Sequence, residues 1–260
     1  MTARILAIAG SDSGGGAGIQ ADIKTITCLG GFAMTAVTAI TVQNTLGVSA
    51  VHPVPPEIVA AQIRACIDDI GVDAIKIGML GSEAVVEAVA AALDGVAVPI
   101  VLDPVMIAKG GAPLIAEDAV WALMQRLVPR AAVITPNVPE LIALTETEVE
   151  DAADMLLAAQ ELLNAGPRAV LAKGGHLDGD ALTDWLVTRH GHQAFTDTRI
   201  ATTSSHGTGC TLSAALACGL GQGLGLADAV ARARAFVRQG LERAPGLGGG
   251  HGPLRFQPLP

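Results

Sequence analysis

The sequence predicts an α/β protein in which helices cover both faces of a mostly parallel sheet. Short β-branched runs alternate along the chain with Ala- and Leu-rich segments of helical periodicity. The predicted strands are apolar almost throughout, as strands buried on both faces are. No repeat, linker or low-complexity block divides the 260 residues, so we expect one domain over residues 1–260.

Six segments have the length and composition of buried strands. They are Ile5–Ala9, Ala36–Val42, Ala74–Gly78, Ile100–Asp103, Ala132–Thr135 and Ala169–Ala172. The segment Leu182–Ile200 predicts instead an antiparallel hairpin that turns near Gly191. The sheet is therefore expected to be parallel at its centre and to carry an antiparallel edge.

Helical periodicity marks the segments between these strands. The predicted helices are Ile19–Leu29, Pro56–Ile70, Glu83–Leu93, Glu117–Leu127, Ala152–Leu163, Cys210–Leu220 and Leu226–Arg243. Gly30-Gly31 and Gly166-Pro167 follow two of them, and these residue types commonly end helices.

Composition excludes several classes of partner. The net charge is −9, and no cluster of Lys and Arg offers a surface for a nucleic-acid backbone. Only 2% of the residues are aromatic, so base stacking is not expected either. Mean hydropathy is +0.49, yet the charge-free stretch Gly207–Ala227 is interrupted by Gly, Ser, Thr and Gln and makes a poor membrane span. We therefore predict a soluble protein with no nucleic-acid or membrane partner.

The cysteines and the first residues favour a reducing compartment. Four cysteines occur without a CxxC pair, and the apolar start of the chain is too short for a signal peptide. Free thiols in the cytoplasm are expected. The histidines show neither HExxH nor Cys/His ligand spacing, so a zinc site is not expected.

The first predicted strand leads into a glycine-rich segment. Gly14, Gly15, Gly16 and Gly18 would let the backbone approach a ligand closely. The spacing matches neither GxGxxG nor the Walker motif, and no Gly-Lys pair occurs in the chain. A tight strand-to-helix turn without a ligand explains these glycines equally well.

A second glycine-rich segment opens a helix. Gly207, Thr208 and Gly209 would direct unpaired N–H groups at one point, which suits an anion such as a phosphoryl group in transit. Cys210 follows them directly, and a first-turn position predicts a thiol pKa lowered toward the thiolate. The alternative is a buried, inert cysteine.

Further candidates follow other predicted strands, where ligands of such sheets gather. Lys173 precedes two glycines and could reach a phosphate. Asn137 and Glu140 lie three apart at a helix start, where they could orient Mg²⁺-bound water or simply cap the helix. Asp103 could belong to the same metal and phosphate network.

Three residues could hold a heteroaromatic ring. The amide of Gln43 could pair with ring polar atoms, and Met79 and Val105 could lie on its two sides.

Together these segments resemble the hydroxymethylpyrimidine/phosphomethylpyrimidine kinases of thiamine biosynthesis, in the ribokinase-like superfamily. The resemblance covers nearly the whole chain. It rests on AGSDSGGGAGIQADIKT at 9–25, TAVTAITVQNT at 35–45, KIGML at 76–80, LDPVM at 102–106, TPNVPE at 135–140, KGGH at 173–176, HGTGCTLSAA at 206–215 and GHGP at 250–253.

The resemblance implies a three-layer sandwich with a mostly parallel central sheet, and a homodimer. It implies two transfers from MgATP, first to the hydroxymethyl oxygen of 4-amino-5-hydroxymethyl-2-methylpyrimidine and then to the resulting monophosphate. It places Gln43 on the pyrimidine edge with Asp22 close by, and Gly10, Met79 and Val105 around the ring. Lys173 with Thr208 and Gly209 would contact phosphates, Asn137, Glu140 and Asp103 would organise Mg²⁺, and Gly207 to Cys210 would form the anion hole.

Two alternatives stay open at this point. A pyridoxal kinase of the same superfamily would bind a ring of similar size with a hydroxymethyl group. A non-catalytic nucleotide-binding protein on the same fold would be expected to lack Lys173, the Gly207–Gly209 pair or the metal-organising residues, all of which are present.

Overall fold

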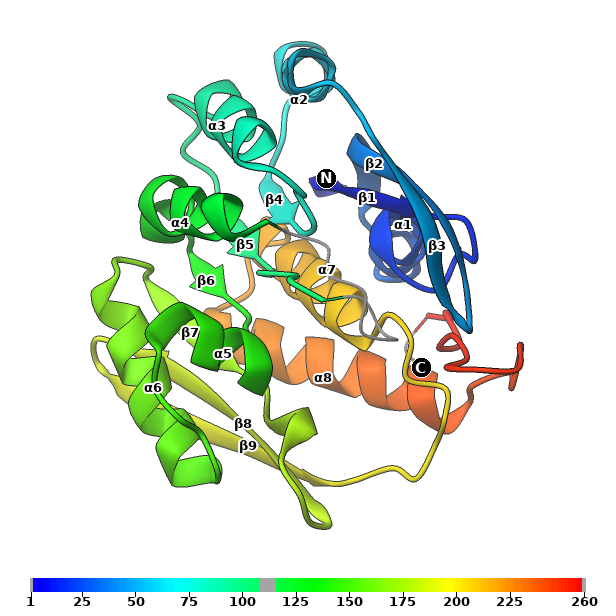
Figure 1. The fold of residues 1–260 in the computed structure, drawn as a ribbon, viewed down its shortest axis with the longest axis vertical. Coiled ribbons are helices and arrows are strands. Elements are labelled where there is room, and N and C mark those ends of the chain that lie inside the picture. The colour runs from blue at the N-terminus through cyan, green and yellow to red at the C-terminus, as the bar shows by residue number, and fades with distance from the viewer. Residues whose placement is uncertain (1, 108–115, 259–260) are drawn as a thin grey trace.

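A computed structural model describes residues 2–107 and 116–258. Nine strands form one sheet in the order β3-β2-β1-β4-β5-β6-β7-β8-β9 (Figure 1). The strands are β1 (Arg4–Asp12), β2 (Phe32–Asn44), β3 (Gly47–Pro53), β4 (Ala74–Ile77), β5 (Ile100–Leu102), β6 (Val133–Ile134), β7 (Ala169–Ala172), β8 (Ala181–Thr188) and β9 (Gly191–Thr198).

The pairing confirms the mostly parallel sheet. Strands β2, β1, β4, β5, β6 and β7 run parallel, whereas β3 pairs antiparallel with β2. The predicted hairpin is confirmed, because β8 and β9 pair antiparallel and meet at Thr188 and Gly191. Strand β3 was not predicted, because its exposed residues lack the apolar alternation of a half-buried strand.

Helices cover both faces of the sheet, as predicted. They are α1 (Gly18–Cys28), α2 (Pro56–Asp69), α3 (Glu83–Ala92), α4 (Glu117–Arg126), α5 (Val138–Thr145), α6 (Ala152–Asn164), α7 (Thr208–Gly221) and α8 (Leu226–Glu242). Helices α2 to α6 lie on one face of the sheet and α1, α7 and α8 on the other (Figure 1). Each group shares one buried apolar cluster with the sheet. Burial of these two clusters is the main favourable contribution to folding. No helix among the described residues is long and apolar enough to cross a membrane.

The alternation of β4 explains how a charged residue enters the core. Ile75 and Ile77 belong to the cluster under α2 to α6, and Ala74 belongs to the cluster under α1 and α7. Successive side chains of a strand point to opposite faces, so Lys76 lies on the α1 and α7 side.

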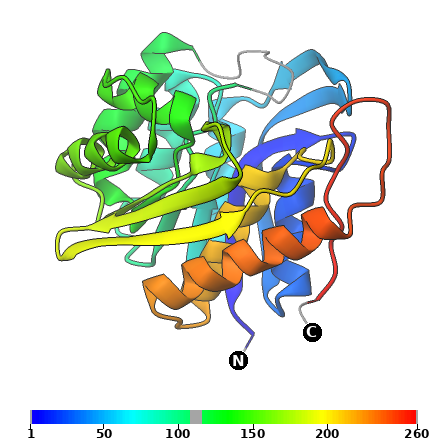
Figure 2. The ribbon, with the colours of Figure 1, turned by 90° about the horizontal axis from the view of Figure 1, so that it is seen from below.

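Two ion pairs fasten the antiparallel edge to the helical layer. Arg234 of α8 pairs with Asp184 of β8 and, at 2.7 Å, with Asp197 of β9. Figure 2 shows α8 running beside this hairpin. The C-terminal segment lies near the β2–β3 turn, where the N–H of His251 donates to the carbonyl of Thr45 at 2.8 Å (Figure 1).

The first turn of α7 lies directly against the glycine-rich loop that follows β1. Gly207, the N-cap residue of α7, has φ +84°, and a Cβ there would collide with the carbonyl oxygen of Gly16. Glycine is therefore required at position 207 for both its backbone conformation and this close approach.

We expect Gly207→Ala to lower the free energy of unfolding by about 3 kcal/mol or more, from left-handed strain plus the collision. Gly223 is the matched control, because its φ is +85° and nothing lies within 4 Å of a Cβ built there. Gly223→Ala should cost only the backbone strain, about 1 kcal/mol. Urea denaturation of both variants measures the difference, and equal losses would contradict the close approach.

Candidate active site

The predicted site residues converge on one cavity at the carboxyl edge of the parallel strands. The cavity has a volume of about 320 Å³. Its lining includes every predicted residue except Asp22, namely Gly10, Gln43, Met79, Asp103, Val105, Asn137, Glu140, Lys173, Gly207, Thr208, Gly209 and Cys210. Residues from seven different segments of the chain are thus brought together by the fold.

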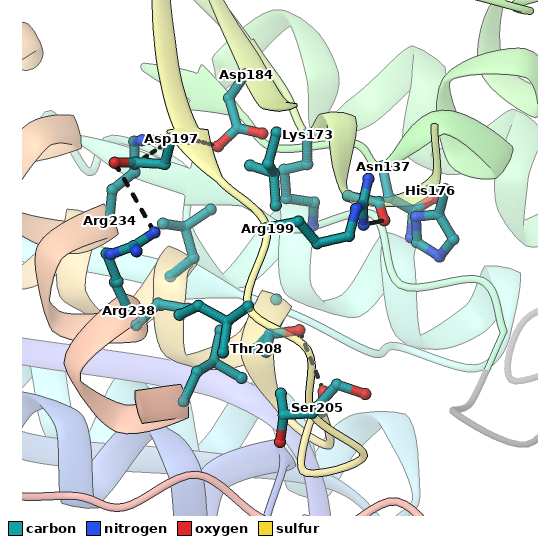
Figure 3. Close-up of a pocket in the computed structure, with 18 of the residues that line it drawn as sticks. Asn137, Lys173, His176, Asp184, Asp197, Arg199, Ser205, Thr208, Arg234 and Arg238 are labelled. Carbon is teal, nitrogen blue, oxygen red and sulfur yellow. Dashed lines mark hydrogen bonds and ion pairs between the residues drawn. The ribbon is translucent and has the colours of Figure 1, made fainter. Parts of the chain in front are cut away.

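A second cavity of about 520 Å³ shares part of this lining. Asn137, Lys173, His176, Ser205, Thr208 and Gly209 line both cavities. Figure 3 shows the second cavity between the β8–β9 hairpin, α8 and the start of α7. Leu182, Val237 and Leu241 give it an apolar wall, and none of these three was predicted as a site residue.

The N-terminus of α7 lies where the two cavities meet. The first intrahelical bond is donated by Thr211 to Gly207, so the N–H groups of Thr208, Gly209 and Cys210 precede it. Within the part of the chain that the structure describes, no side chain caps this helix end. Such N–H groups, backed by the helix dipole, favour an anion.

Lys173 forms the charged centre beside that helix end. Its Nζ lies 2.9 Å from Oδ1 of Asp103 and 3.9 Å from Oε2 of Glu140. Burial alone would lower the pKa of Lys173, but the two carboxyl groups raise it above its ordinary value. Lys173 therefore keeps its positive charge at the junction of the cavities.

Asp103 is held on all sides. Beyond Lys173, its carboxylate accepts hydrogen bonds from Thr135 at 2.9 Å and from Ser213 at 3.2 Å. Burial would raise the pKa of Asp103, but the charges of Lys173 and Lys76 and the hydrogen bonds from Lys173 and Thr135 keep it below its ordinary value. The side chain remains a carboxylate although it is almost fully buried.

Asn137 and Glu140 form a reciprocal cap on α5. Asn137 Oδ1 accepts from the N–H of Glu140 at 2.9 Å, and Glu140 Oε2 accepts from the N–H of Asn137 at 2.8 Å. The capping interpretation is confirmed, and the cap fixes both side chains at the cavity. Burial raises the pKa of Glu140 to about 7.

Cys210 lines the cavity, but its predicted electrostatics were wrong. Burial raises the pKa of its thiol to about 11, although Lys76 and the N–H of Gly18 act in the opposite direction. The helix-end position was expected to lower the pKa, and desolvation outweighs that effect. The side chain is therefore a neutral thiol at neutral pH.

Asp22 does not line the cavity. It is fully buried on α1 and pairs with Lys76 of β4 at 3.0 Å. Lys76, which borders the cavity, was not predicted as a site residue. The signal was present, since a lysine inside the apolar strand Ala74–Ile77 is exceptional unless it is paired.

The first glycine-rich loop folds around Asp12. The carboxylate accepts N–H bonds from Gly14 at 2.7 Å, Gly16 at 3.0 Å and Ala17 at 2.8 Å, and contacts Nε2 of His206 at 2.8 Å. Burial would raise the pKa of Asp12, yet these hydrogen bonds hold it below its ordinary value. The loop thus forms a tight turn, which joins the segment before α7 and also contributes Gly10, Asp12 and Gly18 to the cavity lining. Sequence reasoning missed the pair of Asp12 and His206.

Contacts with neighbouring residues also fix the positions of Gln43 and Met79, which line the same cavity. The Thr41 hydroxyl lies 3.0 Å from Oε1 of Gln43, whose Nε2 lies 3.5 Å from Nε2 of His206. A Cβ at Gly10 would collide with the end of Met79, so only glycine leaves this methionine its place.

Comparison with known proteins identifies the family of the chain. Residues 12–255 match the family model described as phosphomethylpyrimidine kinase. The hydroxymethylpyrimidine/phosphomethylpyrimidine kinase of Escherichia coli is 46% identical over 249 residues, which cover 95% of this chain and 94% of that protein. The bifunctional thiamine biosynthesis protein ThiED of Geobacter sulfurreducens is 47% identical over 251 residues. The match covers 96% of this chain, which spans about half (51%) of that longer protein.

Solved structures show the same fold. An ADP complex of Bacillus subtilis pyridoxal kinase superposes with a TM-score of 0.91 at 34% identity, covering 98% of both chains. A phosphomethylpyrimidine kinase from Clostridium difficile superposes with a TM-score of 0.81 at 39% identity, covering 91% of this chain and 98% of that one. The present chain matches these family members over nearly its whole length and has the ribokinase-like fold. It therefore belongs to the phosphomethylpyrimidine kinase family.

Proposed function

We propose that the chain, as one kinase domain over residues 1–260, phosphorylates 4-amino-5-hydroxymethyl-2-methylpyrimidine with ATP and then phosphorylates the resulting monophosphate. The products serve the biosynthesis of thiamine diphosphate. The observation that carries this proposal is the meeting of two cavities at Lys173 and the N-terminus of α7. Relatives named for this activity are 45–46% identical over nearly their whole length.

The larger cavity suits the nucleotide. Its apolar wall can take a purine base, and its polar end lies at Lys173 and Thr208, where phosphates would lie (Figure 3). Solved relatives described as complexes with ADP and with AMP-PCP support a nucleotide in this fold. ATP is the phosphoryl donor that we assign to it.

The smaller cavity suits the pyrimidine. Gln43 offers an amide for the ring edge, while Met79 and Val105 supply apolar contacts for its faces. Cys210 and the first residues of α7 line the same cavity. A ring bound in this way would point its hydroxymethyl group toward the junction of the two cavities.

Transfer itself needs little covalent chemistry from the protein. Phosphoryl transfer depends chiefly on alignment and on stabilising charge on the group in transit. The N–H groups of Thr208, Gly209 and Cys210 and the ammonium of Lys173 provide that stabilisation from the junction. Because Asp103 and Glu140 hold Lys173, its charge is in place before the substrates bind.

The donor set at Lys173 also fits Mg²⁺ held through water. Asp103, Asn137 and Glu140 offer hard oxygen ligands, which this ion prefers. The caps already occupy one oxygen of Asn137 and one of Glu140, so contact through water suits these side chains better than direct ligation. When bound, Mg²⁺ would neutralise charge on the nucleotide phosphates.

A neutral thiol at position 210 suits an enzyme with two different acceptors. In the first step an alcohol must lose its proton, and we assign its acceptance to the minor thiolate form of Cys210, which Lys76 favours and which forms when the thiol releases its own proton to water. In the second step the acceptor is already an anionic phosphate that needs no base. A carboxylate at this position would repel that phosphate, whereas a thiol with a pKa of about 11 does not.

A second candidate function is pyridoxal phosphorylation. A structure of Staphylococcus aureus pyridoxal kinase in complex with pyridoxal superposes with a TM-score of 0.91, compared with 0.81 for the Clostridium difficile enzyme. Pyridoxal carries a hydroxymethyl group on a ring of similar size. Sequence identity favours the pyrimidine, and the third candidate, a non-catalytic nucleotide-binding protein, does not explain why the charged centre is complete.

We also propose that two copies associate through the β2–β3 hairpin. Ile40, Val42 and Val51 are exposed on it, and large apolar side chains grouped on one surface favour association. Thr41 and Gln43 line the cavity from the same strand, so the alternation of β2 turns Ile40 and Val42 away from the site. With free thiols and ATP as donor, we place this dimer in the cytoplasm.

The product spectrum tests the activity. With MgATP and equal amounts of hydroxymethylpyrimidine and pyridoxal in one reaction, we expect the pyrimidine monophosphate to form first and the diphosphate to follow. Mass spectrometry distinguishes all products. Pyridoxal phosphate as the main product would move the assignment to the second candidate, and no transfer to either acceptor would favour the third.

Cys210→Ala tests the division between the two steps. We expect kcat/KM for the alcohol acceptor to fall by roughly 10²-fold or more, the usual contribution of a group that assists proton transfer. The value for the monophosphate should change far less, because that acceptor needs no base. Steady-state kinetics with each acceptor separately gives both values. Equal losses in the two steps would show that the thiol has no step-specific role.

Val42→Asp tests the proposed dimer. The side chain of Val42 is 60% exposed, and a charge there should shift the protein from dimer to monomer in sedimentation equilibrium because it would be buried in the interface. Leu157→Asp on α6 is the matched control, since Leu157 is 61% exposed but lies on another surface. A dimer that survives Val42→Asp would place the interface elsewhere.

A further inference from the structure

An ion pair lies beneath the acceptor cavity. Lys76 of β4 and Asp22 of α1 approach within 3.0 Å, and neither side chain is exposed at all. The second carboxylate oxygen of Asp22 has no hydrogen-bond partner among the described residues, so Lys76 is its main polar contact. Replacing such buried pairs by apolar residues is often neutral or stabilising. Stability alone therefore gives little reason for charges at these positions.

The surrounding structure makes room for the ammonium group. A Cβ at Gly78 would lie 2.8 Å from Nζ of Lys76, so a larger residue at position 78 would displace it. Lys76 also borders the cavity that holds Cys210 and Gln43. The lysine thus runs from the strand toward the acceptor end of the site.

Four charged groups surround the Cys210 thiol from different elements. Lys76 acts on it from β4 and Asp22 from α1, and Asp103 acts from the end of β5. Lys173 interacts with it from the end of β7. The backbone N–H of Gly18 donates to the sulfur. Lys76 is the positive group that most favours negative charge at this sulfur, and Asp22 opposes it.

We propose that Lys76 is a positioning residue whose ammonium group supplies positive charge beneath Cys210 and the reacting oxygen of the acceptor, with Asp22 as its counter-ion. This inference rests on the proposed function and extends it. The two acceptors have one need in common, because negative charge develops on the alcohol oxygen and is already present on the phosphate. A fixed positive charge below the cavity stabilises both. Asp22 thereby acts on the acceptor only through Lys76.

The reactivity of the Cys210 thiol reports this charge without any substrate. Iodoacetamide alkylates thiolates, so at fixed pH its rate follows the thiolate fraction. Lys76→Met removes the positive charge and should slow alkylation of Cys210 about tenfold, equivalent to one unit of thiol pKa. Asp22→Asn keeps a hydrogen-bonding oxygen but removes the negative charge, and should accelerate alkylation by about as much. Asp103 remains close enough to help keep Lys76 protonated in that variant.

Peptide mass spectrometry of the alkylated protein measures each cysteine separately. Cys28 and Cys66 are free, partly exposed and outside the cavity lining, so they serve as internal controls whose rates should not change. Opposite changes at Cys210 in the two variants support the proposal. A purely structural pair would loosen the site in both variants, so changes of the same sign, or no change, overturn it.

The double variant Lys76→Met/Asp22→Asn covers the case in which a single variant does not fold, since it leaves no unpaired buried charge. Slower alkylation of Cys210 than in the unmodified protein is expected there, and an unchanged rate overturns the proposal. Because no acceptor or ATP is present, these results are independent of the proposed function. If the unmodified protein phosphorylated neither pyrimidine nor pyridoxal, the proposed function would be wrong. The alkylation rates of Cys210 would still show whether Lys76 and Asp22 act on the thiol.

Discussion

The site depends on the buried carboxylate of Asp103. This one side chain contacts Lys173 after β7, Thr135 after β6 and Ser213 of α7, and it lies itself at the end of β5. A buried charge is tolerated only when it is paired and hydrogen-bonded, so these partners are required for the carboxylate to remain charged. In turn the carboxylate keeps the three strand ends and the helix in one arrangement. The charged carboxylate of Asp103 holds the ammonium group of Lys173, which we assign to the phosphates, in its position.

The second constraint is the contact between the glycine-rich loop and the start of α7. Gly16 and Gly207 let the two backbones meet, and Asp12 with His206 joins them by a charged hydrogen bond at 2.8 Å. The first loop thereby packs against the residues whose N–H groups begin α7. Rigid placement of these groups before substrate arrives is what makes electrostatic stabilisation effective.

Positive and negative side chains alternate within the site, and this arrangement explains which of its groups are ionised. Asp22, Lys76, Asp103 and Lys173 alternate in sign around the Cys210 thiol. Charge separation of this kind allows ionised groups to exist in a desolvated region, while Cys210 stays neutral and the pKa of Glu140 rises to about 7. A site of this composition can accept an anion without first losing a negative group of its own.

The sequence alone predicts the layered α/β fold and the strand ends that carry the site, and every predicted site residue except Asp22 lines the acceptor cavity. It could do so because strand periodicity and glycine placement are local properties. Three features depended on tertiary structure. The direction predicted from sequence for the pKa of Cys210 was wrong, because desolvation depends on what covers the thiol rather than on its place in the helix. The Asp22–Lys76 and Asp12–His206 pairs join residues 54 and 194 positions apart, and no local pattern encodes which distant side chains meet. The apolar wall of the larger cavity comes from β8 and α8, whose leucines and valines are indistinguishable in sequence from ordinary core residues.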